Sequence, residues 1–332
     1  MDTKNVIAAI SLSAAVIILY SLFFAPSPNE LKKIDEPKSS LSSEAPKLEE
    51  SEKIVELSRD QALKESNRVK FENQNIKGSI SLIGGTIDDL IFKNYTETLD
   101  GKNKITLLNP KKYSEGYFVE TGWVSSSKNI ELPSSNTSWK VEGNNKLTPG
   151  NPVTLVWNNN QGISFKKKIK IDEKFLFSID QIITNQSEKS YDFYAYGQII
   201  RNKSPEVTNF YILHEGLIGV LNDQLVEKDY DDIEEKEFSQ KAETGWLGIT
   251  DKYWITTLIP EKNKEFRADF NFKNKFRANF IETKPLELES KGTVSSNVRV
   301  IVAAKEVDVI DSYAEKSNIS KFDLAIDWGW FY

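Results

Sequence analysis

The residues that could do acid–base chemistry in this chain gather around its single histidine, His214, which is followed by Glu215. A histidine beside a carboxylate can act as a general base. Neighbouring residues on a strand point to opposite faces, however, so these two side chains need not converge. We therefore expect His214 to be a hydrogen-bonded structural residue. One histidine and no cysteine exclude a multi-histidine metal site, a thiol nucleophile, a thiolate metal site and disulfide bonds.

Other catalytic and binding motifs give weaker signals still. Among the 49 acidic residues no pair stands out as a glycosidase dyad, and Gly84-Gly85 lies between predicted strands rather than before a phosphate-binding helix. The acidic stretch at 230–238 lacks the glycine and glutamate spacing of a calcium loop. The net charge of −6 argues against nucleic-acid binding, and Lys166-Lys167-Lys168 is interpreted as the outer face of a strand. We expect a protein that is not an enzyme, with no catalytic residue, no cofactor and no metal.

Hydrophobic residues recur with a period of two over most of the chain, which is typical of strands. Val153, Leu155 and Trp157 share one face, and the stretch that follows alternates through Ile163, Phe165, Lys167, Ile169 and Ile171. Turn signals recur about every 8–15 residues, and long helical patterns are scarce. The pattern predicts a mainly β fold, a large antiparallel β-sandwich of two sheets around one core.

The N-terminal region is different. Residues 6–25 carry no charge, and as a helix they would span about 30 Å, the thickness of a bilayer's hydrocarbon core. We favour an uncleaved transmembrane anchor over a signal peptide, because the apolar stretch is long and Phe23-Phe24-Ala25-Pro26 is a poor cleavage site. Residues 1–5 then form a cytoplasmic stub. Residues 26–67, rich in Ser, Glu, Lys and Pro, are predicted to be a flexible linker with at most a transient helix within 47–66.

Four stretches of the chain carry recognisable motifs: Arg68-Val69 with GSISLIGGTIDDLIFKNY, HEGLIGVLNDQLVEKDYDDI at 214–233, GWLGITDKYWITTLIP at 245–260 and KFDLAIDWGWFY at 321–332. Together they resemble one family, the YidC membrane-protein insertases of the YidC/Oxa/Alb group. The first resembles the opening strands of that family's periplasmic domain, the third a signature near the domain's end, the second the segment before that signature, and the fourth the entry to the second membrane span. The signature positions are expected to be structural; they are His214, Glu215, Gly216, Gly245, Trp246, Asp251, Lys252, Tyr253 and Trp254.

Within the signature, Trp246, Tyr253 and Trp254 could line a peptide-binding surface, but we prefer the interpretation that they fill the core. Asp251-Lys252 is predicted to be a turn whose charges face water or pair locally.

The resemblance implies a periplasmic β-sandwich at 68–305 (a β-supersandwich, similar in shape to sugar-binding sandwiches), an amphipathic interfacial helix at 306–325 and the start of a second transmembrane span at 326–332. The residues expected at the membrane interface are Phe322, Ile326, Trp328, Trp330, Phe331 and Tyr332. A helix that caps the sandwich is equally compatible with the spacing. The chain would then be a fragment that breaks off before the insertion-active membrane bundle.

The resemblance also implies a function. The family helps inner-membrane proteins to insert and fold, alone or with the Sec translocon, so the implied partners are the Sec translocon and its accessory subunits, nascent inner-membrane proteins and the lipid bilayer. The implied location is the bacterial inner membrane, with the N-terminus cytoplasmic and the main domain periplasmic. Two alternatives remain open. One is a single-span envelope protein whose sandwich binds a sugar or lipid-type ligand, and the other is a sugar-converting enzyme that uses His214.

Overall fold

The computed structural model describes residues 56–99, 101–205 and 213–327. The predicted stub at 1–5, the anchor at 6–25 and the aromatic positions 328–332 lie outside the described residues. Within the described ranges, no helix combines the length and the apolar character needed to cross a membrane.

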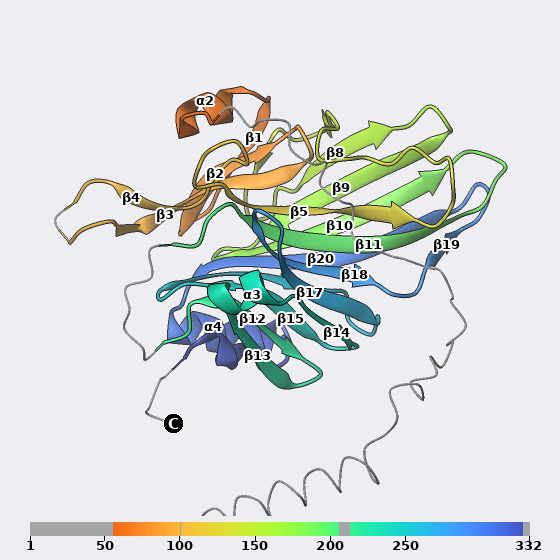
Figure 1. Ribbon diagram of the computed structural model, residues 1–332. Helices are drawn as coiled ribbons and strands as arrows, with labels where there is room; N and C mark the ends of the chain where they lie inside the picture. Colours follow the sequence, from red (N-terminus) through yellow and green to blue (C-terminus); the bar gives the residue numbers. More distant parts are fainter. Residues whose placement is uncertain (1–55, 100, 206–212, 328–332) are drawn as a thin grey trace, which may run out of the picture. The chain divides into compact units, whose positions relative to one another are not determined.

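Two large sheets form the described part of the protein, as the alternating pattern predicts. In Figure 1 one sheet extends from the orange strands to the teal strand β14, and the other extends from the lime strands to the teal strand β13. The 11-stranded sheet follows the order β14 (Phe238–Ala242), β17 (Phe266–Phe272), β18 (Phe276–Glu282), β11 (Tyr191–Arg201), β5 (Tyr117–Ser125), β3 (Thr86–Thr96), β2 (Ile76–Ser81), β1 (Arg68–Glu72) and β7 (Lys146–Leu147), with β19 (Leu286–Leu288) on β11 and β4 (Lys104–Leu108) on β3. The nine-stranded sheet follows the order β13 (Gln224–Asp229), β12 (Gly216–Leu221), β15 (Gly245–Thr250), β16 (Trp254–Ile259), β20 (Thr293–Ala304), β10 (Leu176–Asn185), β9 (Ile163–Ile171), β8 (Val153–Asn158) and β6 (Lys140–Glu142). Neighbouring strands pair antiparallel except for β1 with β7, which are parallel.

Alternating side chains build the core between the sheets. Along β9 and β10 every second residue is buried, and the register places Ile179 opposite both Ile169 and Val298. Phe71 of one sheet meets Phe177 of the other edge to face, with ring centroids 5.1 Å apart. A single hydrophobic cluster includes residues of both sheets. The predicted fold class, an antiparallel β-sandwich with one core, is confirmed.

The predicted flexible linker ends earlier than residue 67. Ser58 caps the short helix α2 (Arg59–Lys64), and Gln61 completes a capping box with it. Arg59 then ties the helix to the sandwich through an ion pair with Asp89 and a 2.8 Å hydrogen bond to Asn109. The expectation of a transient helix was therefore wrong for these residues, because tertiary contacts hold α2 in place.

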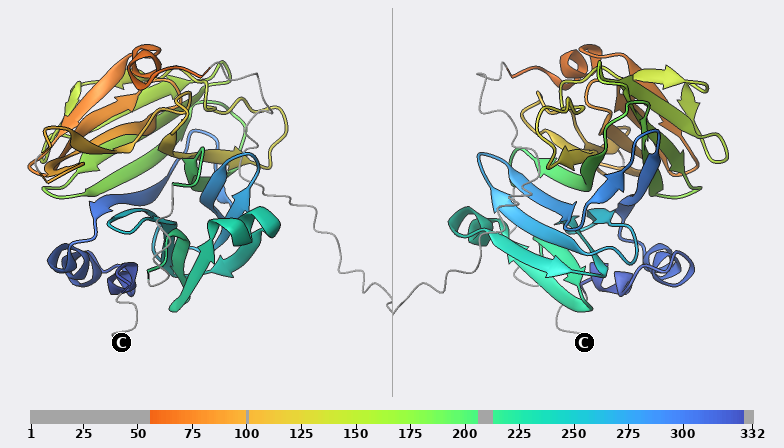
Figure 2. Two further views of the ribbon diagram at one scale, coloured as in Figure 1. Left: turned by 60° about the vertical axis from the view of Figure 1, so that its left-hand side comes forward. Right: turned by 90° about the vertical axis from the view of Figure 1, so that its right-hand side faces the viewer.

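The segment predicted as one interfacial helix at 306–325 forms two pieces, α4 (Val307–Lys316) and the 3-10 turn η1 (Phe322–Ala325). Left-handed backbone at Asn318 and Lys321 separates them. The buried side of α4 contributes Val309, Ile310 and Tyr313 to the core, while its acidic side faces solvent. The apolar face therefore packs on the sandwich instead of on a bilayer. In both views of Figure 2, α4 and η1 (dark blue) lie at the same end of the sandwich as β12 and β13 (teal), and the short helix α3 (Tyr230–Glu235) lies on the opposite side of those strands.

Candidate functional site: a signature cluster at one end of the sandwich

The signature residues lie on strands β12, β15 and β16, in the segment just before β12 and in the turn that joins β15 to β16. His214 precedes β12, and its ring is engaged on both sides: Nε2 lies 3.1 Å from the carbonyl oxygen of Leu217, and Nδ1 lies 3.1 Å from Oδ1 of Asp229. Its backbone N–H donates to Oδ2 of Asp327 at 2.9 Å. The side chain of His214 is only 10% exposed. The geometry therefore agrees with a structural role, in which this histidine joins β12 to its neighbour and to the end of the C-terminal segment.

Glu215 does not join His214 in a catalytic pair. Its Oε1 accepts a 2.8 Å hydrogen bond from the backbone N–H of Lys252, in the turn between β15 and β16. Both residues thus use their polar groups to hold neighbouring segments of chain. The same turn carries Tyr253, whose ring lies 5.2 Å from the Lys252 ammonium group.

The prediction that the signature aromatics fill the core holds for one residue fully and for another in part. Trp246 is fully buried, and its indole N–H donates to the carbonyl oxygen of Ser320 at 3.1 Å. Trp254 is half-buried and stacks on Phe92 with ring centroids 4.7 Å apart. Tyr253 contradicts the prediction, because 60% of its surface is exposed.

Asp251 lies in the predicted turn, but its charge neither faces water nor pairs locally, because it is buried against Arg201, 50 residues away along the chain. Its Oδ1 lies 2.6 Å from Nη1 of Arg201, at the end of β11, and the side chains are 12% and 15% exposed. The guanidinium group also donates to the hydroxyl of Tyr230 and lies 4.7 Å from the ring of Tyr117. Burial alone would lower the pKa of Arg201, but the Asp251 carboxylate and the hydroxyl groups of Tyr230 and Tyr117 together outweigh burial, and the pKa is raised. No sequence motif marked Arg201, which lies 50 residues before Asp251 along the chain.

The signature glycines are required by close strand pairing. A β-carbon on Gly216 would lie 2.4 Å from the carbonyl oxygen of Lys228, and one on Gly245 would lie 1.8 Å from that of Val220. The φ angle of 133° at Gly245 is one that side-chain-bearing residues rarely adopt. These glycines let three neighbouring strands approach one another.

Two of the six predicted membrane-interface residues can be placed, and both pack on the sandwich. The Phe322 ring is fully buried and meets Trp246 edge to face, with ring centroids 5.2 Å apart. Ile326 is partly buried against the core. For Phe322 the expected contact with lipid is therefore wrong, because its ring has no exposed surface.

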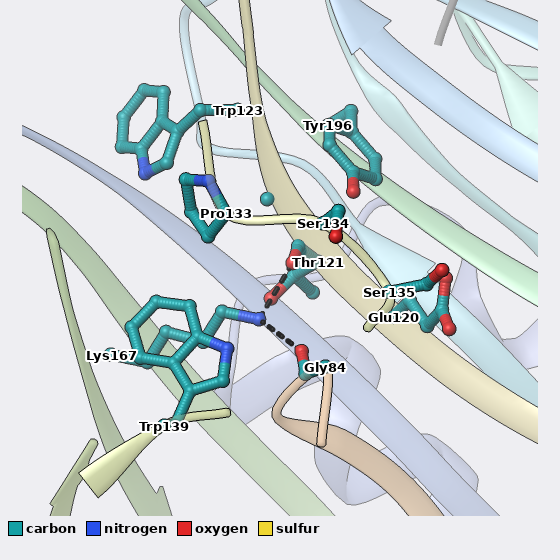
Figure 3. Close-up of a pocket in the computed structure, with 11 residues that line it drawn as sticks. Gly84, Glu120, Thr121, Trp123, Pro133, Ser134, Ser135, Trp139, Lys167 and Tyr196 are labelled. Carbon is teal, nitrogen blue, oxygen red and sulfur yellow. Dashed lines mark hydrogen bonds between the residues drawn. The ribbon is translucent and has the colours of Figure 1, made fainter. Parts of the chain in front are cut away.

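A second polar site lies at Lys167, the middle residue of the run that was interpreted as the outer face of a strand. Lys166 and Lys168 are partly exposed, but Lys167 is buried and points inward (Figure 3). Its ammonium group donates to the carbonyl oxygen of Thr121 at 2.7 Å and to that of Gly84 at 3.4 Å. Burial lowers the pKa of Lys167 to about 8, and the Glu120 carboxylate opposes that shift. The alternation of the strand carried the signal, because it placed Lys167 on the same face as the buried side chains.

Lys167 lines a small pocket whose other walls are aromatic and polar. The lining residues are Gly84, Glu120, Thr121, Gly122, Trp123, Pro133, Ser134, Ser135, Trp139, Lys167 and Tyr196. Oε1 of Glu120 and the indole N–H of Trp139 are buried there without hydrogen-bond partners. The cavity volume is about 10 Å³, enough for one water molecule. A water at this point would satisfy such a donor and acceptor, whereas a sugar ring would not fit.

In the part of the chain that the structure describes, no group of three His, Cys, Asp or Glu residues is arranged to hold a metal ion.

Comparison with known proteins identifies the family. The YidC periplasmic domain family matches residues 68–332. The membrane protein insertase YidC of Pelagibacter ubique is 55% identical over 334 residues, which cover 100% of this chain and 60% of that protein. The protein of the same name from Mesorhizobium japonicum is 40% identical over 282 residues, covering 82% of this chain and 47% of that protein.

Among solved structures, a galactose mutarotase related enzyme from Lactobacillus acidophilus has a TM-score of 0.48 at 10% identity, covering 72% of this chain and 98% of that one. That likeness carries no information on activity. The relatives just described are named as insertases and not as enzymes of a chemical reaction, which agrees with the expectation from the sequence. With the family match over 68–332 and 55% identity along its full length to a named relative, this chain belongs to the YidC family.

Proposed function

We propose that this chain is the N-terminal part of a membrane protein insertase and chaperone of the bacterial inner membrane. The observation that carries the proposal is its similarity, over its whole length, to a relative named membrane protein insertase. The chain spans 60% of that relative. In this proposal residues 6–25 anchor the sandwich at the membrane, and the insertion-active membrane helices belong to the portion of the relatives that this chain does not match.

A chimera tests this function directly. Residues 1–332 are joined to the part of the Pelagibacter ubique relative that this chain does not cover, and the product is reconstituted in proteoliposomes. We expect the chimera to insert a single-span membrane protein, and residues 1–332 alone to insert nothing. A chimera that is folded and yet inactive, beside an active native relative, would contradict the proposal.

The proposed topology places residues 1–5 in the cytoplasm and the sandwich in the periplasm. The absence of cysteine makes this simple to test, because single cysteines at Lys4 and Lys189 can be labelled without background. In intact spheroplasts an impermeant maleimide should label position 189 and not position 4. The reverse pattern would overturn the orientation, while labelling of both positions would show that the anchor does not hold.

The proposed partners are the Sec translocon with its accessory subunits and nascent inner-membrane proteins. Strand β13 offers an edge of the nine-stranded sheet, with Leu225 41% exposed, and an open edge can accept an extended peptide by strand addition. A photo-crosslinker at Leu225 should capture a nascent chain or a translocon subunit in cells. Crosslinks to neither class, with normal insertion, would exclude this edge as the contact.

The competing function, a single-span envelope protein that binds a sugar or lipid-type ligand, has one observation in its favour. In the Lys167 pocket, the buried Glu120 carboxylate oxygen Oε1 and the Trp139 indole N–H have no hydrogen-bond partner, and a ligand hydroxyl group could bind to both. A pocket for a small molecule has a volume of roughly 300–1,000 Å³, however, and this cavity is far smaller. The enzyme alternative fails on the geometry of His214, whose ring nitrogens both face structural partners.

A further inference from the structure

Three aromatic side chains from two distant parts of the chain form a group that we call the aromatic patch: Tyr95, Tyr253 and Trp254. Tyr253 is 60% exposed, while Tyr95 and Trp254 are half-buried. The ring of Trp254 lies 5.2 Å from that of Tyr95 and 6.4 Å from that of Tyr253. The patch is a continuous surface, because these rings touch in sequence.

The core beneath the patch holds it in a fixed position. Trp254 stacks on the buried ring of Phe92, and Tyr253 accepts a 2.9 Å backbone hydrogen bond from Lys305, two residues before Val307. An exposed tyrosine whose backbone and neighbouring ring are both anchored loses little further conformational freedom when it binds a partner.

Hydrogen bonds link the turn that carries Tyr253 to Asp327, the last described residue of the chain. Asp327 accepts a hydrogen bond from the His214 backbone, and the next residue, Glu215, accepts one from the backbone of Lys252 in the turn that carries Tyr253. Two hydrogen bonds therefore connect the patch to Asp327. The sequence that follows Asp327 is Trp-Gly-Trp-Phe-Tyr, in which the aromatic types favour the membrane–water interface.

Charges next to the patch indicate the kind of surface it fits. Glu306 accepts a 2.7 Å hydrogen bond from the Tyr95 hydroxyl, and Asp308 is exposed one residue beyond Val307. These carboxylates disfavour an anionic surface. Lys252, above the Tyr253 ring, supplies one positive charge. Charges of both signs around aromatic rings match a layer of zwitterionic headgroups, which also presents both signs.

We propose that the aromatic patch is a second membrane contact, which lays this end of the sandwich on the zwitterionic headgroup layer of the bilayer. The contact is distinct from residues 306–325, whose apolar face is occupied by the core. It rests on the proposed function in one respect, namely that the chain is anchored in a membrane. Anchoring allows a weak contact of a few rings to be populated, because the tether raises the effective concentration of the patch at the membrane surface.

The experiment uses the full chain and the absence of native cysteine. A fluorophore is attached to a single cysteine at Tyr253 and, as a matched control, at Lys189, an exposed residue of the β10–β11 loop. The chains are reconstituted into phosphatidylcholine vesicles that contain lipids with a nitroxide at the headgroup level. We expect quenching at position 253 at least about twofold stronger than at position 189, because the interface is where such aromatic positions reside. The quenching should persist at 1 M salt, where the Debye length is about 3 Å.

The outcomes separate the two proposals. Chains that fail to co-sediment with vesicles would overturn the anchored function, and the patch proposal with it. Chains that are anchored but equally quenched at both positions would overturn the patch contact alone. A label at position 253 that is shielded from an aqueous quencher in cells but not quenched by lipid nitroxides would also overturn it, and would assign the patch to a protein partner.

Discussion

Replacing Phe322 by alanine tests whether the C-terminal segment is part of the sandwich or a membrane-surface helix. The ring of Phe322 is fully buried, and it meets the rings of Trp246 and Tyr313 edge to face at 5.2 and 6.4 Å. Removing a buried phenylalanine ring costs about 3–5 kcal/mol, from lost burial and from the cavity left behind. At about 2–4 °C per kcal/mol for a domain of this size, the melting temperature should fall by about 6–20 °C.

Circular dichroism melting of the full chain in mild detergent measures this loss, and hydrogen exchange locates it. Exchange should accelerate at residues 307–326 first, because η1 and α4 share the contacts of the lost ring. Val307→Ala is the matched control on the exposed side of the same segment, and it should change the free energy of unfolding by no more than about 0.5 kcal/mol.

A Phe322→Ala chain that melts with the wild type, with unchanged exchange at 307–326, would refute the reasoning. Such a result would mean that Phe322 contributes nothing to the core in solution. The interfacial placement expected from the sequence would then be the better description of this segment.

Three further predictions follow from buried charge and from backbone packing. Asp251→Ala should lower the free energy of unfolding by about 3–5 kcal/mol in urea titrations, since it leaves Arg201 buried without its partner, and a double change to apolar residues should restore most of the loss. Lys167 binds fewer protons in the folded than in the unfolded protein between pH 8 and 10.5, so the free energy of unfolding should rise across that window by up to about 3 kcal/mol. Lys167→Met should flatten this rise. If the substitution leaves the pH dependence of the free energy of unfolding unchanged, that result would count against the lowered pKa. Gly245→Ala should destabilise by more than about 1 kcal/mol because its β-carbon would meet Val220, whereas Gly143→Ala, with open space around it, should cost less; equal losses would show that backbone conformation and not contact decides.

Local pattern was enough for the broad fold but not for the ends of the domain. Alternation in β9 and β10 predicted strands with one buried face, and these strands lie side by side within the nine-stranded sheet. The sequence of residues 59–64 predicts only a transient helix, because few of its residues could contribute to a core. In the structure the ion pair between Arg59 and Asp89 holds this helix against the sandwich. Likewise the amphipathic pattern at 306–325 identified an apolar face and not its partner, since a bilayer and a sandwich surface require the same spacing.

Residue types and their order along the chain determined the β architecture, the lack of thiol and multi-histidine chemistry, and the resemblance to the insertase family, because each depends on composition or short-range spacing. Only the tertiary structure decided which partners the buried charges meet. Arg201 and Asp251 are 50 residues apart and form a buried ion pair, and Lys167, which the strand alternation already placed on the buried face, meets the carbonyl oxygens of Thr121 and Gly84 there. The physical reason is that strand register across the two sheets decides which side chains are buried and which are paired. Register brings together segments that are far apart in the sequence, so short-range sequence patterns do not show which of them will meet.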